Sequence, residues 1–263
     1  YKRQDIVGIS PYLAGWIYAL GIAWDAVTDP FMGYLAERTS SPRGRYRPYI
    51  LFGTIPLALS FVLLFWVPPL EGISLFLCLV VINVFHRTCF TIVSVPYSSL
   101  TPRITSDSEE RTKLTTARMI GASFGTLLMS SLGFPIINFF GQNDESLGII
   151  YLSFISASIA VVILYFTYWS VKESSTEEIK ETYPSVSKLI SSILINYPFW
   201  IVFSSILILG STTIMFNKNL IYYIKYALDL HSYQGLVLGL SGLSSFASIP
   251  FWSYVSLKIG KRN

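Results

Sequence analysis

Two aspartates, Asp25 and Asp29, lie four residues apart in the apolar stretch WDAVTDPFMG at residues 24–33. On a helix, four residues give about 40° of rotation and about 6 Å of rise, so both carboxylates face one side, with Thr28 beside them. Carboxylate and hydroxyl oxygens are hard donors, which suit Na⁺, Li⁺ or H⁺ better than a soft metal. The pattern predicts a cation site formed by Asp25, Thr28 and Asp29. The alternative is a salt bridge to a basic residue of a neighbouring helix.

The composition indicates a protein of the lipid bilayer. The chain has 263 residues, of which 52% are hydrophobic and only 13% are charged, and its mean hydropathy is +0.54. A soluble domain carries about twice that share of charged residues. The net charge of +4 comes from basic residues scattered over short links, which disfavours nucleic-acid binding.

Seven stretches are long and apolar enough to cross a bilayer as helices, which takes about 20 residues each. They cover residues 11–35, 49–67, 73–97, 114–140, 147–171, 199–223 and 236–257. The expected fold class is therefore an all-α, multi-pass membrane protein with about seven transmembrane helices.

Basic residues occur in alternate links between these stretches. The links after the first, third, fifth and seventh stretches contain Arg38, Arg43, Arg45, Arg47, Arg103, Arg111, Lys113, Lys172, Lys180, Lys188, Lys258, Lys261 and Arg262. The links at residues 68–72 and 141–145 contain no Lys or Arg. By the positive-inside rule the basic links are cytoplasmic, and we expect a plasma (cell inner) membrane location.

The chain also resembles itself at an offset of 220 residues. The aligned identities are Gly15 with Gly235, Pro30 with Pro250, Phe31 with Phe251 and Tyr34 with Tyr254. They predict two parallel six-helix halves, and hence a fragment of a twelve-helix protein that lacks the first helix and the last four. The expected parts are an N-terminal bundle at residues 1–171, a cytoplasmic linker at 172–197 and the start of a C-terminal bundle at 198–263.

A polar stripe follows the third apolar stretch. Its members recur at steps of 4, 4, 3 and 4 residues and are Asn83, Arg87, Thr91, Ser94 and Ser98. Polar residues on one side of a membrane helix face other helices or a water-filled path, not lipid. The permanent charge of Arg118, at the start of the fourth stretch, requires a carboxylate or an anionic ligand. Asn83, Arg87, Ser94, Ser98 and Arg118 are therefore candidates for substrate binding and translocation.

The sequence does not indicate an enzyme. Residues 121–125, GASFG, match the G-x-S-x-G pattern of hydrolases, but that motif needs a strand, a sharp turn and a helix. Here it lies in an apolar helical run. No P-loop, dinucleotide-binding or H-E-x-x-H motif is present, so we expect no resident cofactor and no metal other than a coupling Na⁺.

Two segments resemble the glycoside–pentoside–hexuronide:cation symporter family of the major facilitator superfamily. They are WDAVTDPFMGYLAERTSSPRGRYRPYILFG and VPYSSLTPRITSDSEERTKLTTARMIGASFG, and the resemblance runs from Asp5 to about Leu257. It implies two six-helix bundles that couple the entry of Na⁺, Li⁺ or H⁺ to sugar uptake by alternating access.

The resemblance also implies roles for single residues. Asp25 and Asp29 match the family's paired cation-binding aspartates, and Thr91 matches a threonine ligand of the same cation. Arg118 matches an arginine that lies close to the sugar. The expected function is thus symport of a sugar or glycoside with Na⁺ or H⁺.

Departures from the family pattern bear on the substrate. The melibiose permease, the best-known member, has Asn in place of Thr28, Asp in place of Ser94 and Trp in place of Ser98. The last two belong to its sugar site, so a different substrate is implied. Animal relatives that share DAVTDP and VPYS carry lysophospholipids, which leaves a lipid or another organic solute as an alternative cargo.

The basic link after the first stretch is expected to act as a cytoplasmic latch between helices. Its arginines Arg43, Arg45 and Arg47 follow Glu37 closely in the sequence. A channel and a membrane scaffold are the alternative classes of protein. Gradient-driven accumulation of substrate distinguishes a symporter from both.

Overall fold

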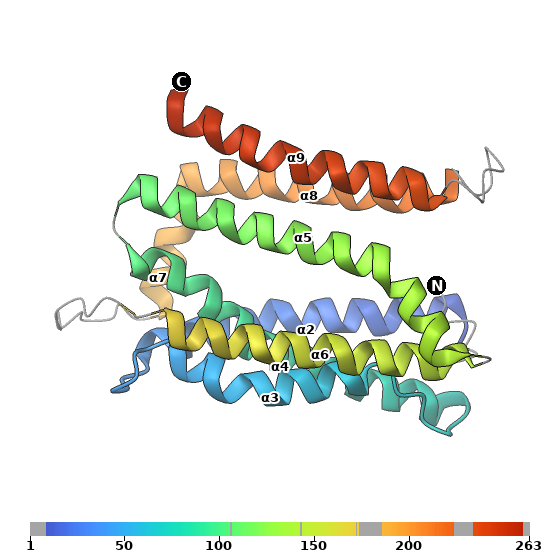
Figure 1. Cartoon of the computed structure of the whole chain (residues 1–263). Helices are drawn as coiled ribbons and strands as arrows, with labels where there is room; N and C mark the ends of the chain where they lie inside the picture. The colour runs from blue at the N-terminus through green and yellow to red at the C-terminus, as the bar shows by residue number, and fades with distance from the viewer. Residues whose placement is uncertain are drawn as a thin grey trace. The chain divides into compact units, whose positions relative to one another are not determined.

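The computed structural model describes residues 9–105, 107–142, 144–171, 173, 186–223 and 234–259, and every regular element among them is a helix. The helices are α2 (Pro11–Arg38), α3 (Arg47–Leu63), α4 (Gly72–Ile104), α5 (Ser108–Gly141), α6 (Glu145–Ser170), α7 (Val186–Ile195), α8 (Tyr197–Tyr222) and α9 (Gln234–Ile259) (Figure 1). All seven predicted stretches are helical, which confirms the all-α fold class. The short α7 falls within the predicted linker.

The sequence predicts seven membrane-spanning stretches, but fewer of the described helices are both long enough and apolar enough to cross a membrane. These helices are Gly72–Ile104, Ser146–Ser170 and Tyr197–Phe216, and a fourth span is added if Ser108–Gly133 and Pro135–Gly141, bent by 43°, are taken together. Helix α3 (Arg47–Leu63) is apolar but shorter than the required 18 residues, and α2 includes Asp25, Asp29, Glu37 and Arg38.

Local signals set several helix ends. Ser10 precedes α2 and its Oγ accepts a hydrogen bond from the backbone N–H of Leu13 at 3.4 Å, while Pro11 takes the first helical position. The carboxylates of Asp107 and Asp144 each accept from two backbone N–H groups at the starts of α5 and α6. Such caps satisfy donors that have no partner inside the helix.

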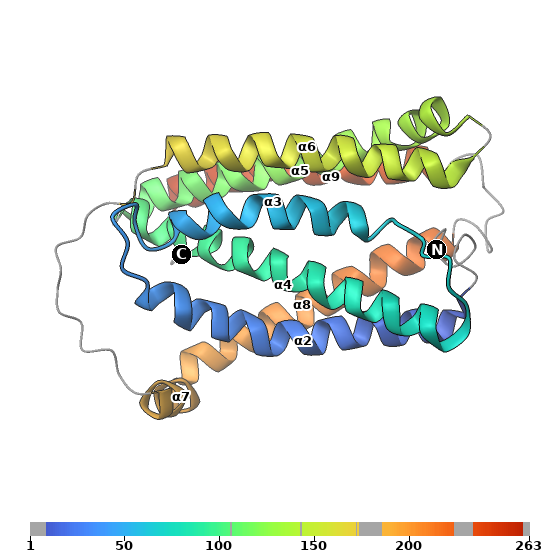
Figure 2. The same cartoon turned by 90° about the horizontal axis from the view of Figure 1, so that it is seen from below.

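The chain divides into two compact units, one of Tyr1–Ser175 with Phe246–Asn263 and one of Thr176–Ser245. Within the first unit, neighbouring helices pack in the order α2, α4, α3, α6 and α5, and α4 also contacts α5 (Figure 2). Helix α4 lies next to α2, and Arg87 and Thr91 of its polar stripe contact α2. The predicted division at residues 171/172 and 197/198 stays a prediction, and residues 172 and 174–185 of that linker lie outside the described part.

An apolar cluster of the first unit lies where the ends of α2, α3, α4 and α6 meet. Its buried members are Met32, Ala36, Tyr46, Ile50 and Leu100, and Leu164, Tyr168 and Val171 pack against it. Most other large apolar side chains on these helices are exposed, as expected of surfaces that face lipid.

Helices α3 and α4 approach each other closely at Gly53. A Cβ atom at this position would lie 2.6 Å from Cγ2 of Val93 and 3.2 Å from Cγ2 of Ile92. Because Val93 is buried, its side chain has little room to move away. The absence of a side chain at Gly53 is thus a requirement of this helix pair.

The substitution Gly53→Ala is expected to destabilise the first unit by roughly 1–3 kcal/mol, because overpacking forces the two helices apart. The control is Gly15→Ala in α2, where no atom lies within 4 Å of the added Cβ. That control should be neutral or slightly stabilising, since alanine favours helices by about 1 kcal/mol over glycine. Melting temperatures of the purified protein in detergent test this, and equal values for the two variants would contradict it.

Candidate functional site

Both intramembrane aspartates of α2 bind side chains of α4. The guanidinium Nη1 of Arg87 donates to Oδ2 of Asp25, forming an ion pair. The hydroxyl of Thr91 donates to Oδ1 of Asp29 at 2.7 Å. The two acids are four residues apart on α2, and their partners are four residues apart on α4, so both carboxylates point to the same side of α2.

A third contact between α2 and α4 was not predicted from the sequence. The indole Nε1 of Trp24 donates to Oγ1 of Thr88 at 2.9 Å, and that hydroxyl donates to the carbonyl of Val84 at 2.9 Å. An indole N–H in an apolar environment needs a hydrogen-bond acceptor, so Trp24 in the apolar stretch could have indicated that a polar residue lies beside it. These contacts fix the register of α2 against α4.

The side chain of Arg87 occupies a space that α2 leaves open at Gly21. A Cβ atom on Gly21 would lie 2.5 Å from Oδ1 of Asn83 and 2.7 Å from Nε of Arg87. The ring of Tyr18 lies 5.6 Å from the guanidinium carbon, within range of a cation–π contact. Oδ1 of Asn83 is buried and accepts no hydrogen bond from the described residues. Arg87 is therefore enclosed by α2 on one side and by its own helix on the other.

The remaining predicted site residues make fewer contacts. The hydroxyl of Thr28 donates to the carbonyl of Trp24 at 3.0 Å, within its own helix. Ser94 is half-buried and Ser98 is exposed on α4. Arg118 is exposed on α5, and none of the described residues forms an ion pair with it. The structure thus brings Asp25, Asp29 and the polar stripe together, but not Arg118.

For Asp25, the structure has the salt bridge that the sequence left open as an alternative to a cation. Across the described ranges, no group of three His, Cys, Asp or Glu side chains is placed to hold a metal ion. The oxygens between α2 and α4 are the two carboxylates of α2 and the hydroxyl of Thr91 on α4, which form a donor set for a proton or a small monovalent cation.

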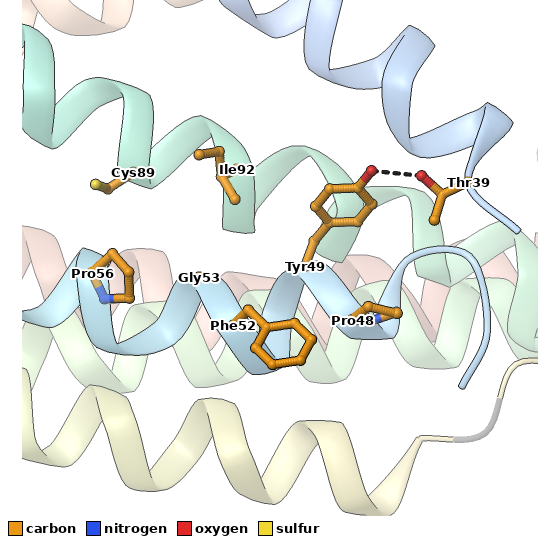
Figure 3. Close-up of a pocket in the computed structure, with 8 residues that line it drawn as sticks. All are labelled: Thr39, Pro48, Tyr49, Phe52, Gly53, Pro56, Cys89 and Ile92. Atoms are coloured by element: carbon orange, nitrogen blue, oxygen red, sulfur yellow. Dashed lines mark hydrogen bonds between the residues drawn. The ribbon is translucent and has the colours of Figure 1, made fainter. Parts of the chain in front are cut away.

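A separate cavity of about 300 Å³ lies between α3 and α4 (Figure 3). It is lined by Thr39, Pro48, Tyr49, Phe52, Gly53, Pro56, Cys89 and Ile92. At one end of the cavity the hydroxyls of Thr39 and Tyr49 form a hydrogen bond with each other, 2.5 Å apart. The cavity is apolar and does not include the acidic pair, so it is not part of the cation site.

Glu37 organises the basic link at the end of α2. Its Oε1 accepts from Nη2 of Arg103 at 2.7 Å and lies 3.7 Å from Nη1 of Arg45. Its Oε2 accepts from the hydroxyl of Tyr46 at 2.6 Å. Burial and the hydrogen bond to Glu37 raise the pKa of Tyr46 to about 12, so the phenol stays protonated at neutral pH.

A second acid, Glu173, caps the start of α3. Its carboxylate accepts from the backbone N–H groups of Arg45, Tyr46 and Arg47 at 2.7, 2.9 and 2.9 Å. The turn that allows this passes through Gly44, whose φ of +100° favours glycine and whose Cβ would lie 2.6 Å from the Glu173 carboxylate. A carboxylate at a helix N-terminus is favoured by the free N–H groups and the helix dipole.

The three arginines of the predicted latch differ in their contacts. Arg45 lies near Glu37, and Arg47 donates to the carbonyl of Tyr168 at the end of α6 at 2.8 Å. Arg43 is exposed, and its backbone N–H donates to Oγ of Ser41. The acid Glu173 was missed by the sequence analysis because it lies 128 residues after Arg45 and belongs to no local pattern.

Comparison with known proteins identifies similar chains of one kind. The family described as "MFS/sugar transport protein" matches residues 4–263. The putative glycoside/cation symporter YagG of Escherichia coli is 29% identical over 229 residues, which cover 87% of this chain and 50% of that protein. The isoprimeverose transporter of Lactiplantibacillus pentosus is 28% identical over 271 residues, covering 98% and 54%.

A vertebrate protein is similar to the same degree. The sodium-dependent lysophosphatidylcholine symporter 1-A of Danio rerio is 28% identical over 293 residues, covering 98% of this chain and 54% of that protein. The chain thus spans about half the length of the curated relatives that it matches.

The Glu173 cap predicts a stability effect at the end of α3. Glu173→Ala is expected to lower stability by roughly 1–3 kcal/mol, because three backbone N–H groups lose their acceptor. Glu173→Gln should have a smaller effect, since its amide oxygen still accepts. The matched control is Glu71→Ala, because the side chain of Glu71 does not cap α4. Thermal unfolding in detergent measures these changes, and a Glu173→Ala melting curve identical to that of Glu71→Ala would refute the cap.

Proposed function

The chain belongs to the MFS/sugar transport protein family, and we propose that it forms part of a symporter that couples entry of a monovalent cation to uptake of a sugar or glycoside. The observation that carries this proposal is the acidic pair of α2, whose two carboxylates bind Arg87 and Thr91 of the neighbouring helix α4. An ionised acid within the hydrocarbon core costs at least about 2.5–3.5 kcal/mol. A transported cation offsets that cost while it is bound.

Alternating access follows from the same electrostatics. A cation bound at the acidic pair neutralises the negative charge that the ion pair of Asp25 with Arg87 leaves uncompensated, which favours the conformation in which both carboxylates face α4. A ligand shifts a conformational equilibrium only by its differential affinity for the two states. The cation therefore prepares the protein for closure over substrate, and the polar side chains next to the pair, Asn83, Ser94 and Ser98, contact the substrate.

The membrane orientation and division of the chain form part of the proposal. The basic links lie in the cytoplasm of a plasma (cell inner) membrane protein, in agreement with the positive-inside rule. Residues 1–171 belong to one helical bundle, 172–197 to the linker and 198–263 to the start of the second bundle. The contacts of Glu37 with Arg45 and Arg103 then form a cytoplasmic latch, which opens and closes with the transport cycle.

The substrate belongs to one of the classes that the relatives' names provide. Isoprimeverose and a glycoside represent sugars, and lysophosphatidylcholine represents the lipid alternative. The full-length protein in proteoliposomes should accumulate one of these labelled probes when an inward Na⁺, Li⁺ or H⁺ gradient is imposed. Saturable uptake and counterflow indicate a carrier, whereas non-saturable flux indicates a channel and no flux indicates a scaffold.

Within that assay, Asp29→Asn is expected to lower gradient-driven accumulation by about tenfold or more, because the neutral amide needs no cation. The control is Asp144→Asn, which makes the same chemical change at the N-cap of α6, where asparagine is an equally good cap. Undiminished gradient-driven uptake by Asp29→Asn would refute the site.

A further inference from the structure

Arg87 places a permanent positive charge directly on one of the two acids of the cation site. Its guanidinium contacts Oδ2 of Asp25, and the two side chains are only 23% and 27% exposed. An arginine keeps its charge under all conditions in a protein. From these contacts we infer that Arg87 is a tethered cation that occupies the Asp25 half of the acidic pair, so that the transported cation binds at Asp29 with Thr91.

This inference rests on the proposed function and specifies its cation stoichiometry. Two ionised aspartates and one guanidinium leave a net charge of −1, which one monovalent cation neutralises. A second inorganic cation at Asp25 would be repelled by the guanidinium and would have to displace it from Oδ2. The geometry therefore favours one transported cation per cycle.

The surroundings of Arg87 hold it in this position. Gly21 leaves the space for its Nε and for Oδ1 of Asn83, since a Cβ atom there would lie 2.7 Å and 2.5 Å from these two atoms. The ring of Tyr18 lies within cation–π range on the α2 side. A flexible surface arginine has no such enclosure, so Arg87 is a fixed part of the site.

The environment of Asp29 differs in the way that the inference requires. Oδ1 of Asp29 accepts a hydrogen bond from the hydroxyl of Thr91, which is only 2% exposed. Its Oδ2 accepts no hydrogen bond from the residues that the structure describes, and no basic side chain among them pairs with it. Asp29 thus retains an oxygen and a full negative charge for a mobile cation, whereas Asp25 has its charge already neutralised.

Removal of the Arg87 charge should create a second place for a small cation. In Arg87→Gln, the carboxylate of Asp25 loses its counter-ion and both acids become available to Na⁺ or Li⁺. Cations that bind only the folded state stabilise it. The melting temperature in detergent should therefore rise when choline chloride is replaced by NaCl or LiCl. We expect this rise, the cation increment, to be larger in Arg87→Gln than in the wild type by about 3 °C or more.

Two further variants complete the test. Arg87→Lys retains the charge and should behave as the wild type towards Na⁺ and Li⁺. Asp25→Asn/Arg87→Gln removes both charges, so it should lose the added cation dependence and be more stable in choline chloride than Arg87→Gln alone. The same Na⁺ and Li⁺ increments in Arg87→Gln and wild type would overturn the inference, as would a double variant no more stable than Arg87→Gln.

The outcome is separable from that of the proposed function. The tethered-cation inference is measured by Na⁺ and Li⁺ alone, without a transported substrate. The proposed function is measured by gradient-driven uptake in the wild-type protein. If the expected cation increments are found but the wild-type protein shows no uptake, symport is refuted and the role of Arg87 is supported. If uptake is found without those increments, symport is supported and the role of Arg87 is refuted.

Discussion

The cost of placing two acids inside an apolar helix is the constraint on which the first unit depends. Each ionised carboxylate in hydrocarbon costs at least about 2.5–3.5 kcal/mol unless a partner compensates it. Helix α4 provides these partners, a guanidinium for Asp25 and a hydroxyl for Asp29. Because the partners repeat at the same four-residue step as the acids, only one register of α2 against α4 satisfies both.

The end of the first unit at the basic link is held by a different set of interactions. Glu37 connects α2 to α4 and to the basic link, and Glu173 caps α3 from beyond the end of α6. Between them lies the apolar cluster around Ile50 and Leu100. Apolar packing of this kind has a single arrangement, whereas charged groups can exchange partners.

Family membership limits the chemistry of the protein but not its cargo. Relatives of nearly equal identity are named for glycosides, for isoprimeverose and for lysophosphatidylcholine. All three names describe a symporter or transporter, and one of them specifies sodium. The individual features of this chain therefore lie in the residues around the acidic pair, where Arg87, Ser94 and Ser98 combine one fixed cation with two small hydroxyls. Small hydroxyls leave room beside the pair for a substrate that supplies its own polar groups.

The sequence by itself determined the membrane environment, the seven long helices and the shared side of Asp25 and Asp29, because these depend on composition and on the fixed geometry of a helix. The helix caps at Ser10, Asp107 and Asp144 are local too, but they were identified from the structure. The sequence left open whether Asp25 meets a cation or a basic side chain, since Arg87 lies 62 residues away. The roles of Gly21 and Glu173 were decided only by the packing of α2 on α4 and of α6 beside α3. Such contacts depend on the order in which helices pack, and no periodicity along one helix contains that information.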